Sequence, residues 1–274
     1  MMQPLICKSF AKLNLCLHVL NQRKDGYHNI ESIFCIIDFF DKLSFQINNS
    51  STVNFKTNFL EINTDDNLVT KAYNIISNSY DISGVDIFLD KKIPIGSGLG
   101  GGSSNAAVTL LALNKIFDLN ISKNDLVEIS EEIGADVPFF INGGVAHVEG
   151  IGEIIKNISI DEKYFVLILP NLNISTKEIF ESLPSRDFMN KCSLRELMES
   201  NFNSFENIVM AKYPILKETK YWLSSFGSVR MSGTGSTLYI EYDNYQSAVD
   251  ANKEIGQKYK SLVVGSLESY EIFT

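Results

Sequence analysis

Alternation of apolar and polar residues predicts a strand over residues 12–20, close to the start of the chain. Leu13, Leu15, Leu17 and Val19 fall on one face of this strand. Because successive side chains of a strand point to opposite faces, Lys12 and Asn14 are expected to project together from the other face. The Asp25-Gly26 turn signal and the return of apolar residues at 30–34 indicate a hairpin or loop beside this strand.

The middle of the chain reads as helices joined to strands. Apolar residues at helical spacing predict a helix over 66–79, and alternation predicts a strand over 85–89. The segment 93–106 then runs from an apolar strand end through glycines into a helix, for which Ser103 or Ser104 is the expected N-cap. Ser122, with Asp125 three residues later, predicts the start of a further helix that ends at Gly134.

Asp136 follows that glycine in the segment "GADVPFFINGG" at 134–144. Proline disfavours helical angles in the residue before it, so Pro138 is expected to keep Val137 out of a helix. Asp136 is therefore predicted to lie in a short, constrained connection.

After residue 160 a new series of predicted strands and helices begins. A strand is predicted over 164–170, and Ser175 with Glu178 predicts the start of a helix. The segment "MSGTGS" at 231–236, hereafter the second glycine cluster, lies between two strand-like segments. We therefore expect two domains, at 1–160 and 161–274.

Composition narrows the functional classes. The 274 residues are 45% apolar and 21% charged, as in a folded globular protein. A formal charge of −9, with no run of lysine or arginine, argues against binding to nucleic acid but not against a nucleotide. No stretch is long and apolar enough for a membrane span or a signal peptide, so a cytoplasmic protein without a membrane association is expected. The four cysteines stand far apart without a C-x-x-C pair, so their spacing indicates neither a zinc site nor disulfides.

The segment 96–104, hereafter the glycine loop, is suited to binding phosphate. Its five glycines let the backbone N–H groups approach an anion, and the helix that follows adds the positive end of its dipole. The loop lacks the G-K-[ST] ending of a Walker A motif. It matches G-x-G-x-x-G, with Asp118 at about the spacing of a dinucleotide-binding acid, but another helix start follows where that motif needs a strand.

Asp136 and Lys12 are the candidates for the reaction centre. Phosphoryl transfer needs a carboxylate that accepts the proton of the attacking hydroxyl, and a cation near the transferred group. The spacing of the two residues in the sequence does not show whether they meet. His18 and His147 are interpreted as structural histidines.

Five segments together resemble the GHMP kinases, in their order and separation: "AKLNLCLHV" (11–19), "RKDGYH" (23–28), "IPIGSGLGGGSSNAA" (93–107), "GADVPFF" (134–140) and "MSGTGS" (231–236). The resemblance implies a two-domain α+β fold with the active site in the cleft between the domains, and ATP as phosphate donor. The long glycine loop and the D-G-Y-H segment are similar to the branch of the family that phosphorylates a cytidine-diphosphate derivative of methylerythritol.

The resemblance also implies roles for individual residues. Asp136 would be the catalytic base and Lys12 its partner. The ATP-binding residues would be Pro94, Ile95, Gly96, Ser97, Gly98, Leu99, Gly100, Gly101, Gly102, Ser103 and Ser104, with Asn67 near adenine. The cytidine substrate would lie near Asn14, Tyr27, His28 and Phe180. Mg²⁺ is expected to accompany ATP; its ligands stay open, with Ser103 or Ser104 as candidates.

Three alternatives stay open at this point. The first is another GHMP kinase that acts on mevalonate, homoserine or a sugar. The second is a catalytically silent nucleotide-binding protein, against which the presence of both Lys12 and Asp136 argues. For Phe180, the alternative to a contact with the base is a place in a core stripe with Ile179 and Leu183.

Overall fold

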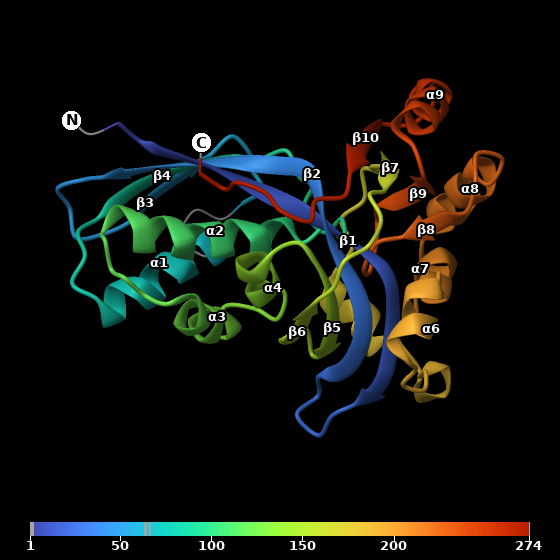
Figure 1. Ribbon diagram of the computed structural model, residues 1–274, viewed down its shortest axis with the longest axis horizontal. Coiled ribbons are helices and arrows are strands. Elements are labelled where there is room, and N and C mark those ends of the chain that lie inside the picture. The colour runs from blue at the N-terminus through green and yellow to red at the C-terminus, as the bar shows by residue number, and fades with distance from the viewer. Residues whose placement is uncertain (1–2, 63–64, 66, 274) are drawn as a thin grey trace.

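The computed structural model describes residues 3–62, 65 and 67–273. Its longest feature is an antiparallel hairpin of β1 (Leu5–Gln22) and β2 (His28–Ile47), which runs through both halves of the molecule (Figure 1). Asp25 caps the turn by accepting a hydrogen bond from the Tyr27 N–H at 3.1 Å. The hairpin therefore brings the start of the chain into contact with both parts of the fold.

A sheet and four helices form the first half of the molecule. The sheet has the order β3-β4-β2-β5-β6, with β1 paired to β2, and its remaining strands are β3 (Asn54–Thr57), β4 (Val85–Asp90), β5 (Val145–Gly150) and β6 (Ile154–Asn157). The helices, which pack against one face of this sheet (Figure 1), are α1 (Leu68–Ser79), α2 (Gly101–Ile116), α3 (Lys123–Glu131) and α4 (Val137–Asn142). The side chains between the two layers belong to the larger apolar core, which continues into the later part of the chain through residues such as Val166, Leu216 and Leu238.

The second half has its own four-stranded antiparallel sheet in the order β10-β7-β9-β8. Its strands are β7 (Tyr164–Ile168), β8 (Val229–Met231), β9 (Leu238–Tyr242) and β10 (Ser261–Gly265). The helices are α5 (Thr176–Glu181), α6 (Leu194–Glu199), α7 (Glu206–Lys212), α8 (Pro214–Leu223) and α9 (Tyr245–Ile255), with a short 3₁₀ turn, η1 (Ser185–Asp187). Mixed helices and sheets in both halves confirm the predicted α+β class.

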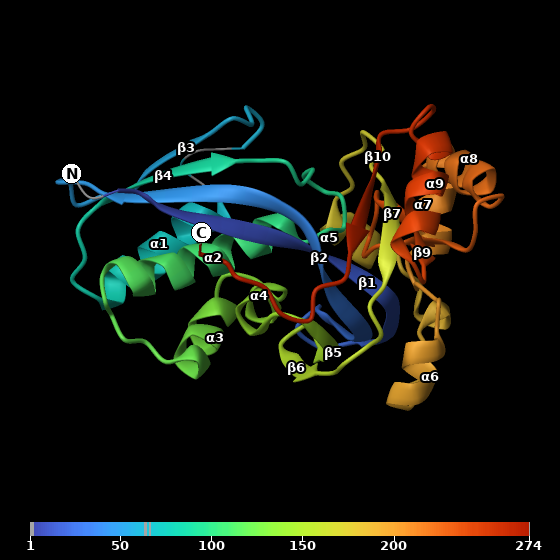
Figure 2. The ribbon, with the colours of Figure 1, turned by 45° about the horizontal axis from the view of Figure 1, so that its top comes forward.

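After β10 the chain returns to the first half, along the β1–β2 hairpin (Figure 2). Ser266 bridges to Ile37, and Phe273 bridges to Cys7 near the start of the chain. The boundary predicted at residue 160 lies between β6 and β7, and we propose it as the limit between two domains.

Local sequence signals placed most of these elements correctly. The strand at 12–20 lies within β1, the helix at 66–79 is α1, and Ser122 and Ser175 cap α3 and α5 by accepting N–H bonds from Asp125 and Glu178. The single apolar face predicted for the first strand was wrong: a bulge between Asn14 and Cys16 interrupts the alternation, so Leu13 and Leu15 pack in one core cluster and Leu17 and Val19 in the other. The prediction for Val137 was wrong, because it is the first residue of α4. Pro138 stands in the first turn of that helix, where its missing N–H leaves no helical hydrogen bond unmade.

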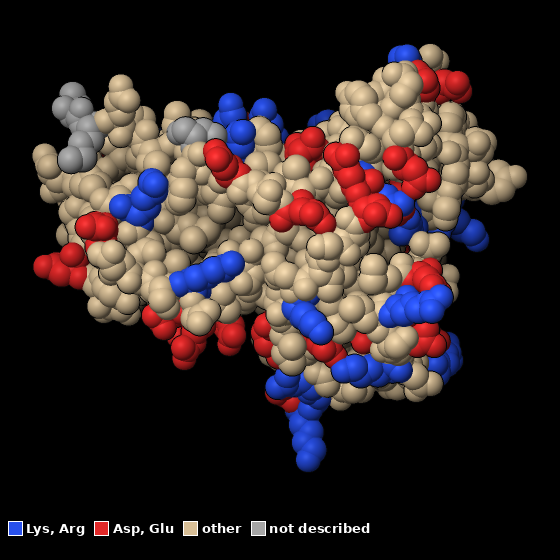
Figure 3. Space-filling model, in the orientation of Figure 1, with Lys and Arg blue, Asp and Glu red and all other residues tan. Residues whose placement is uncertain are grey.

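Lysine and arginine side chains are interspersed with acidic ones on the face shown in Figure 3, and no basic stripe crosses it. Among the described residues, no helix combines the length and the apolar character that crossing a membrane requires.

Candidate active site

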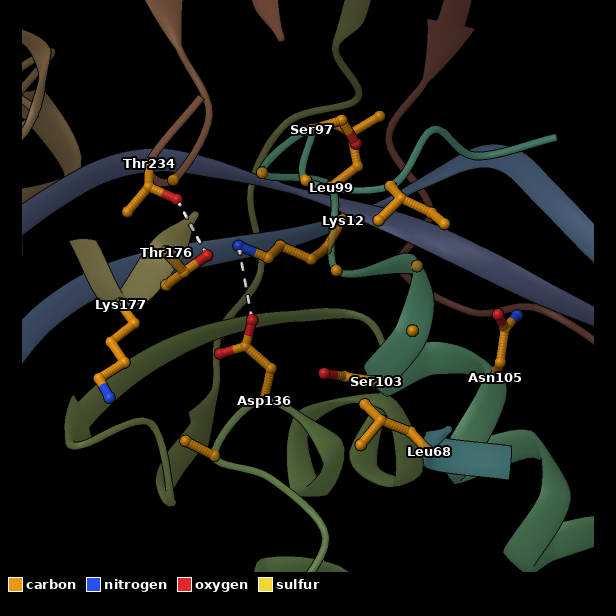
Figure 4. A pocket seen from close by; sticks show the side chains of 18 of the residues that line it. Lys12, Leu68, Ser97, Leu99, Ser103, Asn105, Asp136, Thr176, Lys177 and Thr234 are labelled. Atoms are coloured by element: carbon orange, nitrogen blue, oxygen red, sulfur yellow. Dashed lines mark hydrogen bonds and ion pairs between the residues drawn. The ribbon is translucent and has the colours of Figure 1, made fainter. Parts of the chain in front are cut away.

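A cavity of about 1070 Å³ opens where β1, the glycine loop, α1, the connection before α4, and α5 meet. Figure 4 shows its lining side chains converging from these separate elements. The predicted site residues that line it are Lys12, Asn14, Tyr27, His28, Asn67, Pro94, Ile95, Gly96, Ser97, Gly98, Leu99, Gly100, Gly101, Gly102, Ser103, Asp136 and Phe180. The structure thus gathers into one cavity residues that are scattered along the sequence.

Lys12 and Asp136 point toward one another across this cavity (Figure 4). The Lys12 Nζ lies 3.8 Å from Asp136 Oδ2. The lysine side chain is only 4% exposed, whereas the carboxylate is 32% exposed. A buried cation therefore faces a carboxylate that solvent and a ligand can still reach.

The surroundings of Lys12 fix its position. Its Nζ donates a short hydrogen bond to Asn14 Oδ1 and lies 4.5 Å from the centre of the Phe34 ring. Asn14 is itself held, since its Nδ2 donates to Ser32 Oγ at 3.1 Å. Burial lowers the pKa of Lys12, and the nearby Asp136 charge opposes that effect. The ammonium group is therefore oriented before any ligand arrives.

The glycine loop ends in α2 earlier than the sequence suggested. Gly100, with a φ of 68°, is the N-cap of α2, so the prediction that Ser103 or Ser104 caps this helix was wrong. Both serines stand in its first turn, where Ser103 lines the cavity and Ser104 accepts a hydrogen bond from Ser9 Oγ at 2.8 Å inside the core. A Cβ at Gly100 would lie 2.8 Å from the Phe140 ring, so the tight approach here requires glycine.

The second glycine cluster packs directly against the glycine loop. Ser232 Oγ donates to the Gly98 carbonyl at 2.9 Å and accepts from the Asn14 N–H at 3.2 Å. On the loop itself, the Ser97 carbonyl accepts from the Thr237 N–H at 3.1 Å. These bonds tie the loop to the second half of the chain and to β1, and so fix its distance from Lys12.

A buried ion pair beneath the start of the glycine loop was missed by the sequence reasoning. Lys91 Nζ lies 2.6 Å from Asp41 Oδ2, and their side chains are 3% and 0% exposed. Asp41 also accepts hydrogen bonds from the backbone N–H groups of Lys92 and Ile93 at 2.6 and 2.8 Å. An acid inside the apolar run of β2 was the one available signal, since a fully buried carboxylate needs a partner.

Further side chains reach the cavity from α5 and the second glycine cluster. Thr176 and Thr234 lie 3.2 Å apart through their hydroxyl oxygens (Figure 4). Lys177 also lines the cavity and is exposed. Thr234 belongs to a motif that the sequence had singled out, whereas no signal distinguished Thr176 and Lys177 from ordinary polar surface.

Tyr27, His28 and Phe180 occupy a part of the cavity lining that is rich in aromatic groups. Tyr27 is 60% exposed, whereas His28 is buried with its ring centre 5.4 Å from that of Phe180. Burial lowers the pKa of His28, which favours the neutral ring with one donor and one acceptor nitrogen. Ile179 is fully buried in the larger apolar core, whereas Phe180 packs against that core from its edge and also lines the cavity.

Asn67 has a structural task in addition to its place in the cavity lining. It is the N-cap of α1, where its Oδ1 accepts from the Val69 and Thr70 N–H groups at 2.9 and 3.0 Å. The Thr70 hydroxyl in turn accepts from the Asn67 N–H at 3.2 Å. This capping box holds the start of α1 at the edge of the cavity.

Comparison with protein families places both halves of the chain. The GHMP kinases N terminal domain matches residues 67–144, and the GHMP kinases C terminal domain matches residues 181–261. The first match contains the glycine loop and Asp136, and the second contains the second glycine cluster. Lys12, on β1, lies outside both matched ranges.

Curated relatives resemble the chain over most of its length. It is 39% identical over 260 residues to the 4-diphosphocytidyl-2-C-methyl-D-erythritol kinase of Shewanella denitrificans, with coverage of 93% of this chain and 92% of that protein. It is 42% identical over 241 residues to the enzyme of the same name from Francisella tularensis, with coverage of 85% of each.

Solved structures agree with this assignment. A crystal structure of 4-(cytidine 5'-diphospho)-2C-methyl-D-erythritol kinase is 28% identical, with a TM-score of 0.83 and coverage of 95% of this chain and 98% of that one. The homoserine kinase of Cytophaga hutchinsonii, at 16% identity, has a TM-score of 0.74 and coverage of 100% and 96%. At that identity the second likeness shows the shared fold alone.

Proposed function

The chain belongs to the GHMP kinase family, and within it to the 4-diphosphocytidyl-2-C-methyl-D-erythritol kinases; from this premise we infer the following reaction. The γ-phosphate of ATP moves to the 2-hydroxyl of 4-diphosphocytidyl-2-C-methyl-D-erythritol, which leaves ADP and the 2-phosphate. This reaction serves the non-mevalonate route to isoprenoid precursors. The observation that carries the inference is the approach of Lys12 to Asp136 in a cavity that the glycine loop also lines.

Asp136 is the proposed catalytic base. Its partly exposed carboxylate can accept the proton of the attacking hydroxyl as the oxygen–phosphorus bond forms. Lys12 lies 3.8 Å away and is held by Asn14, so its charge offsets negative charge near the transferred phosphoryl group. Because most of the catalytic work in phosphoryl transfer is positioning and electrostatic stabilisation, a fixed pair of this kind fits the reaction.

The ATP phosphates are proposed to bind along residues 94–104. The first turn of α2 directs backbone N–H groups without helical partners toward the cavity end of the helix, and the helix dipole favours an anion there. Asn67, at the start of α1, is proposed to approach adenine.

Mg²⁺ is proposed as the partner of ATP, where it would neutralise phosphate charge. The cavity offers an oxygen donor of the kind this ion prefers in the Ser103 hydroxyl. Of the two candidate serines, we favour Ser103, because the Ser104 hydroxyl is buried against Ser9.

The cytidine end of the substrate is proposed to lie against Tyr27, His28 and Phe180. Tyr27 and Phe180 offer aromatic faces for stacking, and the neutral His28 ring can donate and accept hydrogen bonds at the edge of the base. Asn14 is engaged by Lys12 and Ser32, so we propose that it acts on the substrate chiefly by holding Lys12. The proposed location of the enzyme is the cytoplasm, without a role for nucleic acid.

The test is a coupled measurement of ADP release with Mg-ATP and 4-diphosphocytidyl-2-C-methyl-D-erythritol, run beside mevalonate, homoserine and galactose. Release with the cytidine compound alone supports both the reaction and the substrate. Turnover of another acceptor instead would retain the kinase chemistry and refute the cytidine site. No turnover with any of the four, in a protein that binds ATP, would refute the proposed activity.

A further inference from the structure

A second group of chemically capable side chains lies outside the cavity, between the β1–β2 hairpin and the segment that leads into α6. His18 on β1 stands opposite Glu31 on β2 in the strand register, and Cys192 approaches both from the segment between η1 and α6. One ligand atom from each of the three residues lies within 4.8 Å of the other two. We call these three residues the His18 cluster; none of them lines the cavity.

The distances between the ligand atoms of the His18 cluster are close to those between the ligands of a tetrahedral metal ion. Cys192 Sγ lies 3.9 Å from His18 Nδ1 and 3.7 Å from Glu31 Oε2. A tetrahedral zinc ion, with bonds of about 2.3 Å to sulfur and about 2.0 Å to nitrogen or oxygen, separates sulfur from either of the others by about 3.5 Å. A contraction of a few tenths of an ångström would therefore close the cluster around an ion.

Glu31 is a buried carboxylate whose two oxygens face different neighbours. Its side chain is 0% exposed, and its Oε1 lies 3.3 Å from His147 Nε2. Its Oε2 accepts a hydrogen bond from the Cys192 N–H at 3.2 Å and faces Cys192 Sγ at 3.7 Å. A buried carboxylate is costly unless it is paired, and a cation beside Oε2 would supply that pairing.

The two other members are arranged as ligands usually are. His18 directs Nδ1 toward Cys192, while its Nε2 lies 2.9 Å from Ser200 Oγ, the outer hydrogen bond that orients a ligating histidine. Cys192 is only partly buried, so an ion can reach the cluster from solvent.

We propose that His18, Glu31 and Cys192 form a zinc site that joins the β1–β2 hairpin to the segment before α6. The ligands are His18 Nδ1, Glu31 Oε2 and Cys192 Sγ, with the fourth position open to water. A soft thiolate with an imidazole selects zinc over Mg²⁺, the ion of the kinase reaction. A thiolate and a carboxylate together also balance a divalent charge.

His147 acts in this site as a positioning residue. Its Nε2 faces the Glu31 oxygen that the ion leaves free, so it can hold the carboxylate in the ligating orientation. Loss of such an outer partner lowers metal affinity by roughly 10- to 100-fold. Loss of a direct ligand is expected to lower it further.

Zinc binding would also tie down a segment that the Met189 N–H already anchors to the Val19 carbonyl at 2.8 Å, so zinc is expected to raise the thermal unfolding temperature.

The test uses the full chain, stripped of metal with EDTA and kept reduced with a phosphine, and titrated with Zn²⁺ against a chromophoric chelator. One zinc ion per chain is expected for the unmodified protein, with much weaker binding for Cys192→Ser and His18→Gln. Cys7→Ala, which removes a buried thiol elsewhere, and Asp136→Asn, which alters the cavity, should both retain it. Unfolding curves of the metal-free variants show which of them are folded.

Co²⁺ supplies a second readout that needs no variant. A cobalt–thiolate charge-transfer band in the unmodified protein, lost in Cys192→Ser, supports the assignment. Absence of that band, a stoichiometry of zero, or equal zinc affinity in Cys192→Ser would each overturn it. Loss of binding in Asp136→Asn instead would place the ion in the cavity and would equally refute the site.

Discussion

Replacement of Asp41 by asparagine tests how far the buried Asp41–Lys91 pair stabilises the fold beneath the glycine loop. Asparagine keeps the shape of the side chain and an oxygen that can accept from the Lys92 and Ile93 N–H groups. The variant removes the negative charge 2.6 Å from Lys91 Nζ, where both side chains are almost fully buried, and with it the oxygen that accepts from Asn105 Nδ2 at 3.0 Å. The change in stability therefore reports the unpaired ammonium group together with the loss of one buried hydrogen bond.

The magnitude follows from what Lys91 can do without its partner. Burial lowers the pKa of Lys91 in the native protein, and Asp41 is the group that opposes this effect. Breaking a buried pair by removing one partner costs about 3 to 5 kcal/mol. The upper limit is set by deprotonation, because neutralising a lysine of ordinary pKa at pH 7 costs about 5 kcal/mol. We expect Asp41→Asn to lower the free energy of unfolding by about 3 to 5 kcal/mol.

The assay is urea unfolding at pH 7 followed by circular dichroism, with the free energy taken from the midpoint and the slope. Asp86→Asn is the matched control, because Asp86 is an exposed strand aspartate that also accepts side-chain hydrogen bonds; its effect should stay within about 0.5 kcal/mol. Adding Lys91→Met to Asp41→Asn removes the stranded charge and should recover most of the loss. A loss below about 1 kcal/mol in the single variant, or no recovery in the double variant, would refute the reasoning.

Three further predictions concern the cavity. Asp136→Ala should lower kcat by about 100- to 10,000-fold, the usual contribution of a general base, with ATP affinity unchanged in a direct titration; normal turnover would remove Asp136 from the mechanism. Tyr27→Ala should raise KM for the cytidine substrate roughly 5- to 150-fold through lost stacking, while KM for ATP stays constant. Replacement of the exposed Tyr221 by alanine should alter neither KM. A raised KM for ATP with an unchanged KM for the cytidine substrate would show that the two ends of the cavity are assigned the wrong way round. Gly98→Ala would place a Cβ 2.1 Å from a backbone oxygen of the second glycine cluster at a φ of 75°, so it should weaken ATP binding and lower thermal stability. Gly26→Ala, at a φ of 88° with nothing within 4 Å, isolates the backbone strain, and equal thermal destabilisation by both would show that the contact is unimportant.

The cavity and the proposed zinc site share one structural cause. Both are built where β1 and β2 extend from the first half of the molecule into the second, so each strand carries polar residues toward two sites. Lys12 and Asn14 serve the cavity, while His18 and Glu31 serve the cluster further along the same hairpin. Because both faces of this hairpin are covered, it can bury polar residues, provided that each forms a hydrogen bond or an ion pair.

The sequence by itself determined the features that depend on neighbouring residues. The existence of β1, the turn at Asp25-Gly26, the caps of α3 and α5 and the strand–loop–helix order around the glycine loop all follow from local backbone preferences. Local rules failed at the start of α2, where the preference for serine as an N-cap competed with the need for a left-handed backbone. Gly100 caps α2 in place of the serines, because only glycine fits its left-handed conformation against the Phe140 ring.

Tertiary structure alone decided which polar side chains meet. Lys12 and Asp136 come from a strand and a helix start far apart in the sequence, and the Asp41–Lys91 pair and the His18 cluster are likewise assembled from separate segments. Cys192 shows the difference most clearly: its spacing from the other cysteines indicated no metal site, yet the fold brings it to a histidine and a glutamate. Contacts of this kind depend on strand register and on how the layers pack, and the spacing of residues along the chain determines neither.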